Sequence, residues 1–292
     1  YLNIDAVIAA ARKTGADAIH PGYGFLAENP AFARRCAKEG ILFIGPSPEA
    51  MELLGDKVGA RQTMQKQGVP ITPGMIERTE DVAVLKQHAG KIGFPLLIKA
   101  SAGGGGKGMH IVASPDELEQ AAEAAIRIAR SAFGNGAVYL EKYIANPRHI
   151  EFQIAADGKG NALHLHEREC SIQRRYQKVV EESPSVALDD DLREKMGQAA
   201  VRTALASGYN SVGTVEFMLD GDRFYFMEVN ARIQVEHPVT EMRTGIDLVK
   251  TQIRLAAGEP LPFRQEDIRP RGHAIECRIY AEDPDNDFAP TP

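Results

Sequence analysis

Lys99-Ala100-Ser101-Ala102-Gly103-Gly104-Gly105-Gly106-Lys107-Gly108 is a glycine-rich stretch that lies between two apolar segments. The segments at 94–100 and 109–112 have the length and apolar character of β-strands. Glycines let backbone N–H groups approach phosphate oxygens without intervening side chains. A strand, a glycine loop and a second strand therefore predict a flap that closes over a triphosphate, with Lys99 at its base.

Other interpretations of this loop fit less well. It is not a Walker A loop, because Gly108 follows Lys107. The glycines also match the dinucleotide fingerprint, but that fingerprint requires a helix next, and here a strand is expected. A second partial match at 22–27 is interpreted as a turn for the same reason. A merely flexible surface loop is the alternative that the pattern leaves open.

The chain before the loop alternates helices and strands. Apolar residues at helical spacing in 4–11 precede a short strand at 17–20, and a second strand is expected at 41–44. Asn29-Pro30 predicts the start of the helix between them. This alternation is typical of a parallel-sheet unit. A helix at 56–67 and a proline-rich connector then lead toward the glycine loop.

Antiparallel hairpins are predicted after the loop. Residues 149–155 and 162–166 flank a turn at 157–160, and 213–219 and 223–229 flank Asp220-Gly221-Asp222. The predicted fold class is therefore a mixture of α/β and α+β. Four parts are expected: an N-terminal parallel-sheet part at 1–55, a helical linker at 56–73, a small lid at 74–145 and a larger antiparallel part at 146–292.

The second hairpin predicts a metal site. Its turn places Glu216 roughly opposite Glu228, and residues that face each other across an antiparallel pair project from the same face. Two carboxylates about 5 Å apart repel each other unless a cation lies between them. Hard oxygen ligands at that spacing suit Mg²⁺ that bridges nucleotide phosphates.

A polar alternation follows this hairpin. Polar side chains occupy every second position: Glu228, Asn230, Arg232, Gln234 and Glu236. If the backbone stays extended, one face of this segment is wholly polar and the other wholly apolar. A solvated edge strand would show the same alternation. We favour an active-site wall, because these groups would converge on one patch beside the carboxylate pair.

Three weaker signals occur elsewhere. Arg174, Arg175 and Lys178 form a basic cluster that is either a solvated charge run or a site for a small anion. His164 and His166 share a strand face, but no third metal ligand is apparent, so we interpret them as structural or surface residues. Arg278 on an alternating segment is ambiguous by itself.

Composition limits the classes of function. The chain of 292 residues has a net charge of -6, which disfavours nucleic acid as the main partner. No segment approaches the ~20 apolar residues of a membrane span. Three widely spaced cysteines fit a reducing compartment. The sequence begins at Tyr1 without a methionine and ends in an apparent loop, so both ends look cut and a targeting peptide is not excluded.

Long, ordered motifs over the whole chain resemble the biotin carboxylase family. They include His-Pro-Gly-Tyr-Gly-Phe-Leu-Ala-Glu at 20–28, Gly-Asp-Lys at 55–57, Lys99 with its glycine loop, and the segments 141–143, 146–149 and 173–182. Glu-Val-Asn-Ala-Arg-Ile-Gln-Val-Glu-His-Pro at 228–238 and Glu-Cys-Arg at 276–278 are close to signatures. The resemblance implies an ATP-grasp fold, whose first domain is only partly present and whose last domain is truncated.

The resemblance also implies residue roles. The implied nucleotide-binding residues are Lys57, Lys99, Gly103, Gly104, Gly105, Gly106, Glu141, Lys142, Ile144, His149, Gln173, Met218, Gln234 and Val235. Glu216, Glu228 and Asn230 would bind Mg²⁺, with Mn²⁺ as the alternative metal. Lys178 and Arg232 would hold bicarbonate, with Gln234 and the backbone of Val235 nearby.

The implied reaction uses ATP, bicarbonate and carrier-bound biotin. Glu236 would act as the general base that deprotonates bicarbonate, whose oxygen then attacks the γ-phosphorus to give carboxyphosphate. Carboxyphosphate would decompose to CO₂ and phosphate, and the phosphate would take the biotin N1 proton. Arg278 would stabilise the biotin enolate that captures CO₂. The implied partners are a biotin carboxyl carrier, a carboxyltransferase and a second copy of the chain, in the cytoplasm or in an organelle.

The chain departs from the family pattern in two places. Tyr176 stands where bacterial members often carry histidine, which puts one nucleotide contact in doubt. Lys107 replaces an arginine of some members. The segment 279–284 is more like acyl-CoA carboxylases than pyruvate carboxylases. The competing hypotheses are a carbamoyl-phosphate synthetase half, which does not explain Lys178, Arg232, Glu236 and Arg278, and a non-catalytic nucleotide-binding domain.

Overall fold

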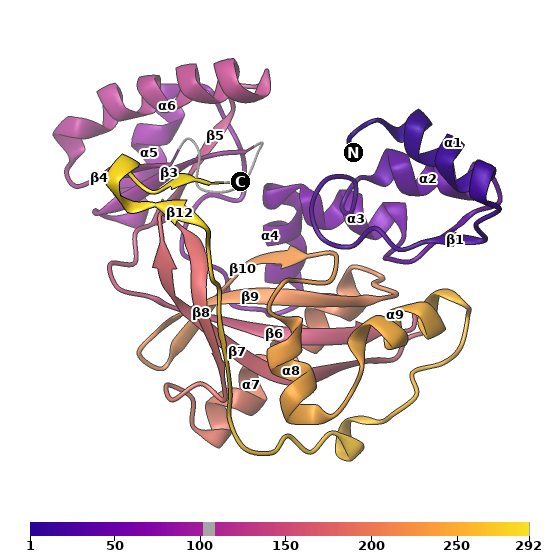
Figure 1. Ribbon diagram of the computed structural model, residues 1–292. Helices are drawn as coiled ribbons and strands as arrows, with labels where there is room; N and C mark the ends of the chain where they lie inside the picture. Colours follow the sequence, from indigo (N-terminus) through magenta and orange to yellow (C-terminus); the bar gives the residue numbers. More distant parts are fainter. Residues whose placement is uncertain (102–108, 292) are drawn as a thin grey trace.

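A computed structural model describes residues 1–101 and 109–291, and its N-terminal part is a small parallel βα unit (Figure 1). The elements are α1 (Ile4–Thr14), β1 (Ala18–Ile19), α2 (Pro30–Lys38), β2 (Leu42–Phe43) and α3 (Pro48–Gly55). Strands β1 and β2 pair in parallel, which confirms the expected alternation. Asn29 caps α2 through its side chain, as the Asn-Pro pair predicted.

A second, smaller sheet forms the lid. Helix α4 (Lys57–Lys66) leads to α5 (Val82–Ile92), β3 (Leu96–Ala100), β4 (His110–Val112), the 3₁₀ turn η1 (Pro115–Glu117), α6 (Leu118–Phe133) and β5 (Val138–Lys142). The strand order is β4-β3-β5, and both pairings are antiparallel. Strands on both sides of the glycine loop are therefore confirmed. The loop glycines Gly103 to Gly106 and Lys107 lie outside the described residues, so the flap stays a prediction.

The largest sheet has six strands in the order β10-β9-β6-β7-β8-β11, all paired antiparallel. Their bounds are β6 (Arg148–Ala156), β7 (Ala162–Arg174), β8 (Gln177–Ser183), β9 (Val212–Asp220), β10 (Arg223–Asn230) and β11 (Ala274–Cys277). The helices of this part are α7 (Asp190–Ala206), α8 (His237–Thr244) and α9 (Leu248–Ala256). Short elements complete it: η2 (Gln265–Asp267), β12 (Glu282–Asp283), η3 (Pro284–Asn286) and β13 (Ala289–Pro290).

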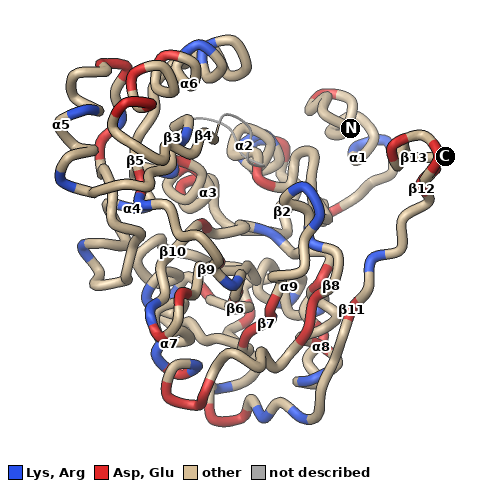
Figure 2. Tube along the Cα trace, turned by 90° about the vertical axis from the view of Figure 1, so that its left-hand side faces the viewer, with Lys and Arg blue, Asp and Glu red and all other residues tan. Residues whose placement is uncertain are grey.

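The two faces of this sheet differ in chemistry because side chains alternate along each strand. On β6, Ile150, Phe152 and Ile154 belong to the apolar core that also contains residues of α7. Glu151 and Gln153, which point the other way, are fully buried and hydrogen-bonded to Arg168. Figure 2 shows acidic residues recurring along β7 and β8 as well. One face of the sheet is therefore hydrophobic and packs in the core with α7, and the other face carries charged side chains.

Two expectations about local structure were wrong. The polar alternation after Glu228 does not continue as a strand, because β10 ends at Asn230 and α8 begins at His237. The intervening backbone is turned away from the sheet, and the Ala231 N–H donates to Glu28 Oε1 at 2.8 Å instead. Strand β7 also runs beyond the predicted 162–166 and joins β8 in a hairpin. Its turn residues, Arg175 and Tyr176, have φ of 52° and 63°. Non-glycine residues seldom adopt this conformation, so the sequence did not predict the turn.

The predicted four-part division stays a prediction. The buried apolar residues form four groups: one lies in the N-terminal part, one lies in the lid, and two involve the large sheet. One of the two sheet groups also contains residues of α2, α3 and α4. In Figure 1 the lid and the N-terminal helices stand on opposite sides above β9 and β10. The space between them holds the candidate site.

Candidate active site

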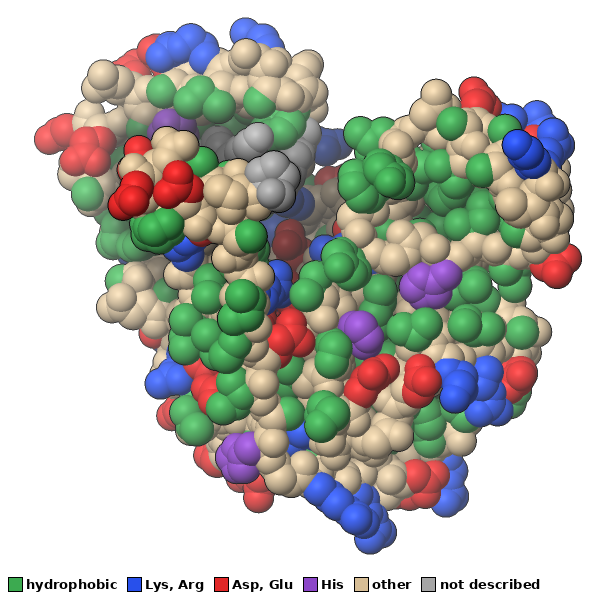
Figure 3. Space-filling model, viewed as in Figure 1, with side chains coloured by type: hydrophobic (Ala, Val, Ile, Leu, Met, Phe, Trp, Pro, Cys, Tyr) green, Lys and Arg blue, Asp and Glu red, His purple; other side chains and the backbone are tan. Residues whose placement is uncertain are grey.

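A cleft of about 470 Å³ opens between the lid, the N-terminal part and the charged face of the large sheet. Figure 3 shows it as a hollow with basic and acidic side chains at its base. Thirteen of the predicted site residues line it: Lys57, Lys99, His149, Gln173, Lys178, Glu216, Glu228, Asn230, Arg232, Gln234, Val235, Glu236 and Arg278. Residues from positions far apart in sequence therefore converge on one cleft.

The predicted carboxylate pair is confirmed as a cross-strand pair. Glu228 of β10 lies opposite Glu216 of β9, next to a bulge after Phe226. Glu216 Oε1 accepts hydrogen bonds from Asn230 Nδ2 at 2.8 Å and Gln234 Nε2 at 3.1 Å. Glu228 lies exposed in the cleft, yet its pKa is raised, first by desolvation from the surrounding protein and then by the charge of Glu216. The two carboxylates repel each other as the sequence argument anticipated.

Lys178 is held by three carboxylates. Its Nζ lies 2.5 Å from Glu151 Oε2, 2.7 Å from Glu216 Oε1 and 2.8 Å from Glu236 Oε1. Burial acts to lower the pKa of Lys178, but the charges of Glu151 and Glu216 outweigh it and raise that pKa well above its usual range. The basic cluster of the sequence therefore separates: Lys178 turns into the cleft, whereas Arg174 pairs with Glu282 outside it.

Glu236 lies between two cations. Its Oε1 accepts a hydrogen bond from Lys178 Nζ, and its Oε2 accepts one from Arg278 Nη2 at 2.9 Å. Arg278 Nε also donates to Glu181 Oε1 at 2.8 Å. Glu236 is only 2% exposed, so this carboxylate and its two cations form a shielded acid–base centre at one end of the cleft.

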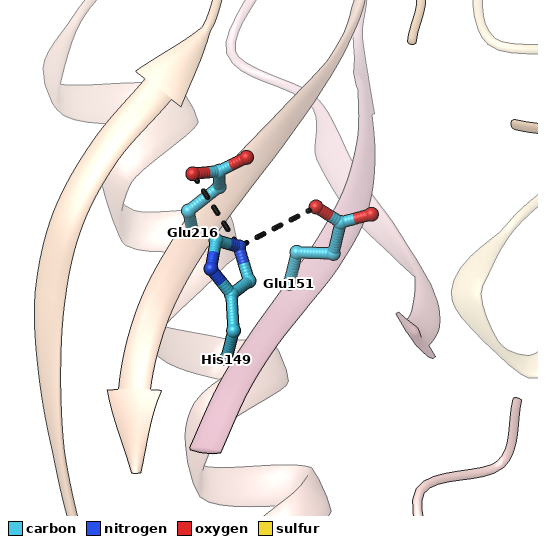
Figure 4. A group of neighbouring side chains, drawn as sticks. All are labelled: His149, Glu151 and Glu216. Atoms are coloured by element: carbon cyan, nitrogen blue, oxygen red, sulfur yellow. Dashed lines mark ion pairs between the residues drawn. The ribbon is translucent and has the colours of Figure 1, made fainter. Parts of the chain in front are cut away.

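His149 of β6 lies beside Glu216 and Glu151, two of the carboxylates that hold Lys178 (Figure 4). Its Nε2 lies 3.4 Å from Glu216 Oε2 and 3.8 Å from Glu151 Oε2. Burial lowers the pKa of His149, but the charge of Glu216 raises it more, so the net shift is upward. These three residues are spaced closely enough to hold a metal ion. Both carboxylates already give an oxygen to Lys178, so its ammonium serves as the cation of this group.

Arg168 is a buried residue that the sequence argument missed. Its guanidinium donates to Glu151, Gln153, Thr214, Gln234 and Thr240, and its exposure is 0%. It thereby fixes Glu151, which holds Lys178, and Gln234, which contacts Glu216. We call Glu151, Glu216, Glu236, Lys178, Arg168 and Arg278 the floor cluster. On β7 Arg168 lies between Glu167 and Glu169, so the sequence around it showed only a short run of charged residues.

A second charged group lies against the lid. Lys99 Nζ is 2.6 Å from Glu141 Oε2, and Arg61 Nη1 of α4 is 2.7 Å from Glu141 Oε1. Lys57, at the first position of α4, has a lowered pKa, chiefly because it is buried. We call Lys57, Lys99, Arg61 and Glu141 the lid-side cluster. Arg61 was not among the predicted site residues.

Arg232 is positioned from the N-terminal part. Its Nε donates to Glu28 Oε2 at 3.0 Å, and its Nη2 donates to Asn230 Oδ1 at 2.9 Å. Glu28 belongs to the motif at 20–28, but no role was predicted for it. Tyr23, from the same motif, lines the cleft together with Met109, Tyr139, Tyr176 and Met227.

Four predicted nucleotide-binding residues are not among the described residues that line the cleft: Glu141, Lys142, Ile144 and Met218. Glu141 is buried in the lid-side cluster. Lys142 Nζ instead donates to the backbone carbonyls of Gly93 and Phe94, at 3.1 Å and 2.6 Å. The structure leaves their predicted roles as proposals.

Comparisons with known proteins identify the family of this chain. Residues 1–51 match the family described as "Biotin carboxylase, N-terminal domain", and residues 56–264 match "Carbamoyl-phosphate synthase L chain, ATP binding domain". A biotin carboxylase from Nostoc sp. is 60% identical over 100% of this chain and 66% of its own length. The chain belongs to the biotin carboxylase family.

Other members of the biotin carboxylase family are similar over the same region. A pyruvate carboxylase subunit from Methanothermobacter thermautotrophicus is 56% identical over 100% of the chain and 60% of its own length. The chain therefore spans about two thirds or less of the length of these relatives.

Solved biotin carboxylase structures confirm the ATP-grasp fold. A biotin carboxylase from Campylobacter jejuni, solved as a β-γ-ATP complex, has a TM-score of 0.95 and 51% identity, over 99% of this chain and 65% of that one. The biotin carboxylase domain dimer of Hydrogenobacter thermophilus 2-oxoglutarate carboxylase has a TM-score of 0.93 and 54% identity, over 99% and 64%. That structure contains MgADP, ADP and bicarbonate.

Proposed function

We propose that this protein is an ATP-dependent carbon–nitrogen ligase that carboxylates carrier-bound biotin with bicarbonate. The observation that carries the proposal is the placement of Glu236 between Lys178 and Arg278, beside the Glu216–Glu228 pair in one cleft. A carbamoyl-phosphate synthetase half would need the carboxylate pair but gives no reason for this centre. The relatives support the same choice, because they carry the name biotin carboxylase or belong to carboxylases.

Nucleotide phosphates fit the lid side of the cleft. Lys57 and Lys99 both line it, and the lid-side cluster has three cations to one carboxylate, which Arg61 and Lys99 contact. An excess of positive charge in a cleft attracts and orients a polyanion. We assign ATP phosphates to Lys57 and Lys99, under the flap of Gly103 to Gly106, with His149 and Gln173 toward the ribose.

Magnesium fits the carboxylate pair. Glu216 and Glu228 face each other across β9 and β10, and the pKa of Glu228 is raised, first by desolvation and then by the charge of Glu216. Carboxylates are the ligands that Mg²⁺ prefers. We assign Mg²⁺ to Glu216 and Glu228, with Asn230 beside them. When bound, the metal would offset charge on the nucleotide phosphates.

Bicarbonate and biotin fit the Glu236 end. Lys178 and Arg232, with Gln234 and the backbone of Val235, would hold the bicarbonate anion. Glu236 would take its proton, which leaves the oxygen free to attack the γ-phosphorus. Arg278 would stabilise the negative charge on the biotin ureido oxygen after phosphate has removed the N1 proton.

The proposed partners are those of the family. Its members are subunits or domains of biotin-dependent carboxylases, and we propose a biotin carboxyl carrier, a carboxyltransferase and a second copy of the chain as partners. The acceptor is proposed to be an acyl-CoA, from the segment 279–284. In the described ranges, no helix combines the length and apolar character that a membrane crossing requires.

The test is ADP release by the intact protein, with and without bicarbonate and free biotin. We expect ADP release that requires bicarbonate and rises with biotin. Glu236→Gln should lower the rate about 10²–10⁴-fold, the usual contribution of a general base. Glu49→Gln, which alters an exposed carboxylate on α3 outside the cleft, is the control and should leave the rate unchanged. Hydrolysis indifferent to bicarbonate and biotin would refute the proposal and leave only an ATP-grasp nucleotidase.

A further inference from the structure

Arg61 is a buried cation to which the proposed chemistry gives no role. Its exposure is 3%, and it projects from α4 beneath the lid sheet. Besides Glu141, its guanidinium donates to the Thr72 carbonyl at 2.7 Å and lies 5.9 Å from the centre of the Tyr139 ring. A charge is costly to bury unless it is paired, so the cost of burying Arg61 must be offset by contact with an opposite charge.

Arg61 shares its partner, Glu141, with Lys99, the lysine that is proposed to bind the nucleotide phosphates. Glu141 gives Oε1 to Arg61 and Oε2 to Lys99, and its side chain is 4% exposed, whereas that of Lys99 is 19% exposed. Arg61 thus lies behind the carboxylate and Lys99 in front of it, at the cleft. Because a guanidinium is planar and rigid, its contact also orients the carboxylate that Lys99 touches.

Charge balance shows what Arg61 contributes. Burial acts to raise the pKa of Glu141, but Lys99 and Arg61 together lower it, so the carboxylate is ionised. With Lys99 alone, the pair would be neutral overall, and the ammonium would be divided between Glu141 and an incoming phosphate. With Arg61 present, the trio keeps one net positive charge, and the accessible end of the trio is Lys99.

We propose that Arg61 is a positioning residue for the phosphate subsite: it neutralises and orients Glu141, so that Lys99 presents its charge to the nucleotide phosphates. The inference rests on the proposed role of Lys99 in ATP binding. The competing explanation is that Arg61 merely ties α4 to β5. That structural role would affect folding but would not distinguish a nucleotide with phosphates from one without them.

Ligand binding separates the two explanations. The dissociation constants of ATP, ADP and adenosine are measured by calorimetry on the intact protein and on Arg61→Met. We expect Arg61→Met to weaken ATP and ADP about tenfold or more, the usual effect of losing a charge-assisted contact, and to leave adenosine unchanged. Arg61→Lys should weaken ATP and ADP less than Arg61→Met does, because it keeps the charge but loses the planar fork that orients Glu141. Arg34→Met, which removes an exposed arginine paired with Glu52, is the matched control.

The double variant Arg61→Met/Glu141→Gln is the decisive comparison. It removes the carboxylate that Arg61 neutralises, so Lys99 should regain its free charge and ATP affinity should return toward the wild-type value. It also leaves no unpaired buried carboxylate, so it provides a folded protein if Arg61→Met does not fold. Unchanged ATP affinity in Arg61→Met, equal weakening of adenosine, or no recovery in the double variant would overturn the inference. Failure of bicarbonate dependence in the wild type would instead overturn the proposed function and leave these binding measurements valid.

Discussion

The two charged clusters on either side of the cleft are balanced differently. The floor cluster pairs three carboxylates with three cations, and each of its members contacts at least one opposite charge. The lid-side cluster has three cations and one carboxylate, Glu141, which Arg61 and Lys99 contact, whereas Lys57 is influenced by the charges of Glu228 and Glu141. Both clusters are largely buried, so the difference in net charge is not diluted by solvent.

This difference indicates a division of labour. The floor cluster satisfies itself without any ligand, so it belongs to the folded architecture as well as to the chemistry. The lid-side cluster is complete only when an anion arrives, so its charge is available for binding. Damage to the floor should therefore appear as lost stability and lost acid–base chemistry, and damage to the lid side as lost nucleotide affinity.

The largest expected effect comes from removing a buried charge of the floor cluster. Arg168→Met removes a fully buried guanidinium and leaves the carboxylate of Glu151 without one of its two cations. Breaking a buried ion pair by removing one partner costs about 3–5 kcal/mol. Urea unfolding should show this loss in the free energy of unfolding. Arg34→Met, at an exposed ion pair, should change it by less than about 1 kcal/mol. Equal effects for the two variants would show that the floor cluster does not stabilise the fold.

Acid should weaken the floor within a defined window. Burial acts to raise the pKa of Glu151, but the charges of Lys178 and Arg168 lower it from 4.5 to about 2. Below pH 4.5 the unfolded chain takes up a proton that the folded chain does not, so this stability is complete above that pH and is lost as the pH falls toward 2. The loss should reach about 3 kcal/mol. Unfolding by urea at a series of pH values should show it, and Glu151→Gln should remove this contribution. The contribution of Glu216 should remain, because burial acts to raise the pKa of Glu216 but the charge of Lys178 outweighs it and holds that pKa well below its usual range.

His164 supplies a separate window as a control. Burial lowers its pKa from 6.5 to about 4, so stability should fall between those pH values as the unfolded chain binds a proton first. His164→Gln should reduce the loss of stability in this upper window and leave the lower window unchanged. A residual loss should remain, because burial also lowers the pKa of His166. If Glu151→Gln flattened both windows, the assignment of the lower one to the floor cluster would be wrong.

A smaller effect would sharpen the comparison at the boundary between the clusters. Glu228→Gln relieves the repulsion with Glu216, so the free energy of unfolding without metal should change by less than about 1 kcal/mol or rise. The Mg²⁺ concentration for half-maximal ADP release should increase about 10–100-fold, because a ligand charge is lost. A variant with unchanged Mg²⁺ dependence would exclude Glu228 from the metal site.

The sequence predicted those parts of the site that local chemistry specifies. The turn at Gly221-Asp222 fixes the alignment of β9 with β10 from the Asp220–Arg223 pair to the Phe217–Phe226 pair, because hairpin turns set strand register. The bulge after Phe226, which the sequence did not predict, then shifts the register by one residue and brings Glu228 opposite Glu216. The strands on both sides of the glycine loop were likewise predictable from apolar runs bounded by glycine.

The remaining parts depend on distant contacts. The polar alternation after Glu228 predicted a straight wall, but Glu28, some 200 positions earlier, captures the backbone of Ala231 where β10 ends. Arg61 and Arg168 have no special spacing, and only the folded chain shows that each is buried among acceptors. The β7–β8 turn uses Arg175 and Tyr176 in place of glycine or asparagine, so turn chemistry gave no warning.

The order of strands in the large sheet has a consequence for synthesis on the ribosome. Strand β6 pairs with β9, which is made only after β7, β8 and α7, and the floor cluster extends from Glu151 to Arg278. At about 5–20 residues per second, roughly 130 residues separate these two members by on the order of 10 s. Throughout that interval the cluster lacks Arg278, the partner of Glu181 and Glu236. The nascent sheet therefore cannot complete the ion pairs of Glu181 and Glu236 until translation has passed β11, so this end of the cleft is assembled late in folding.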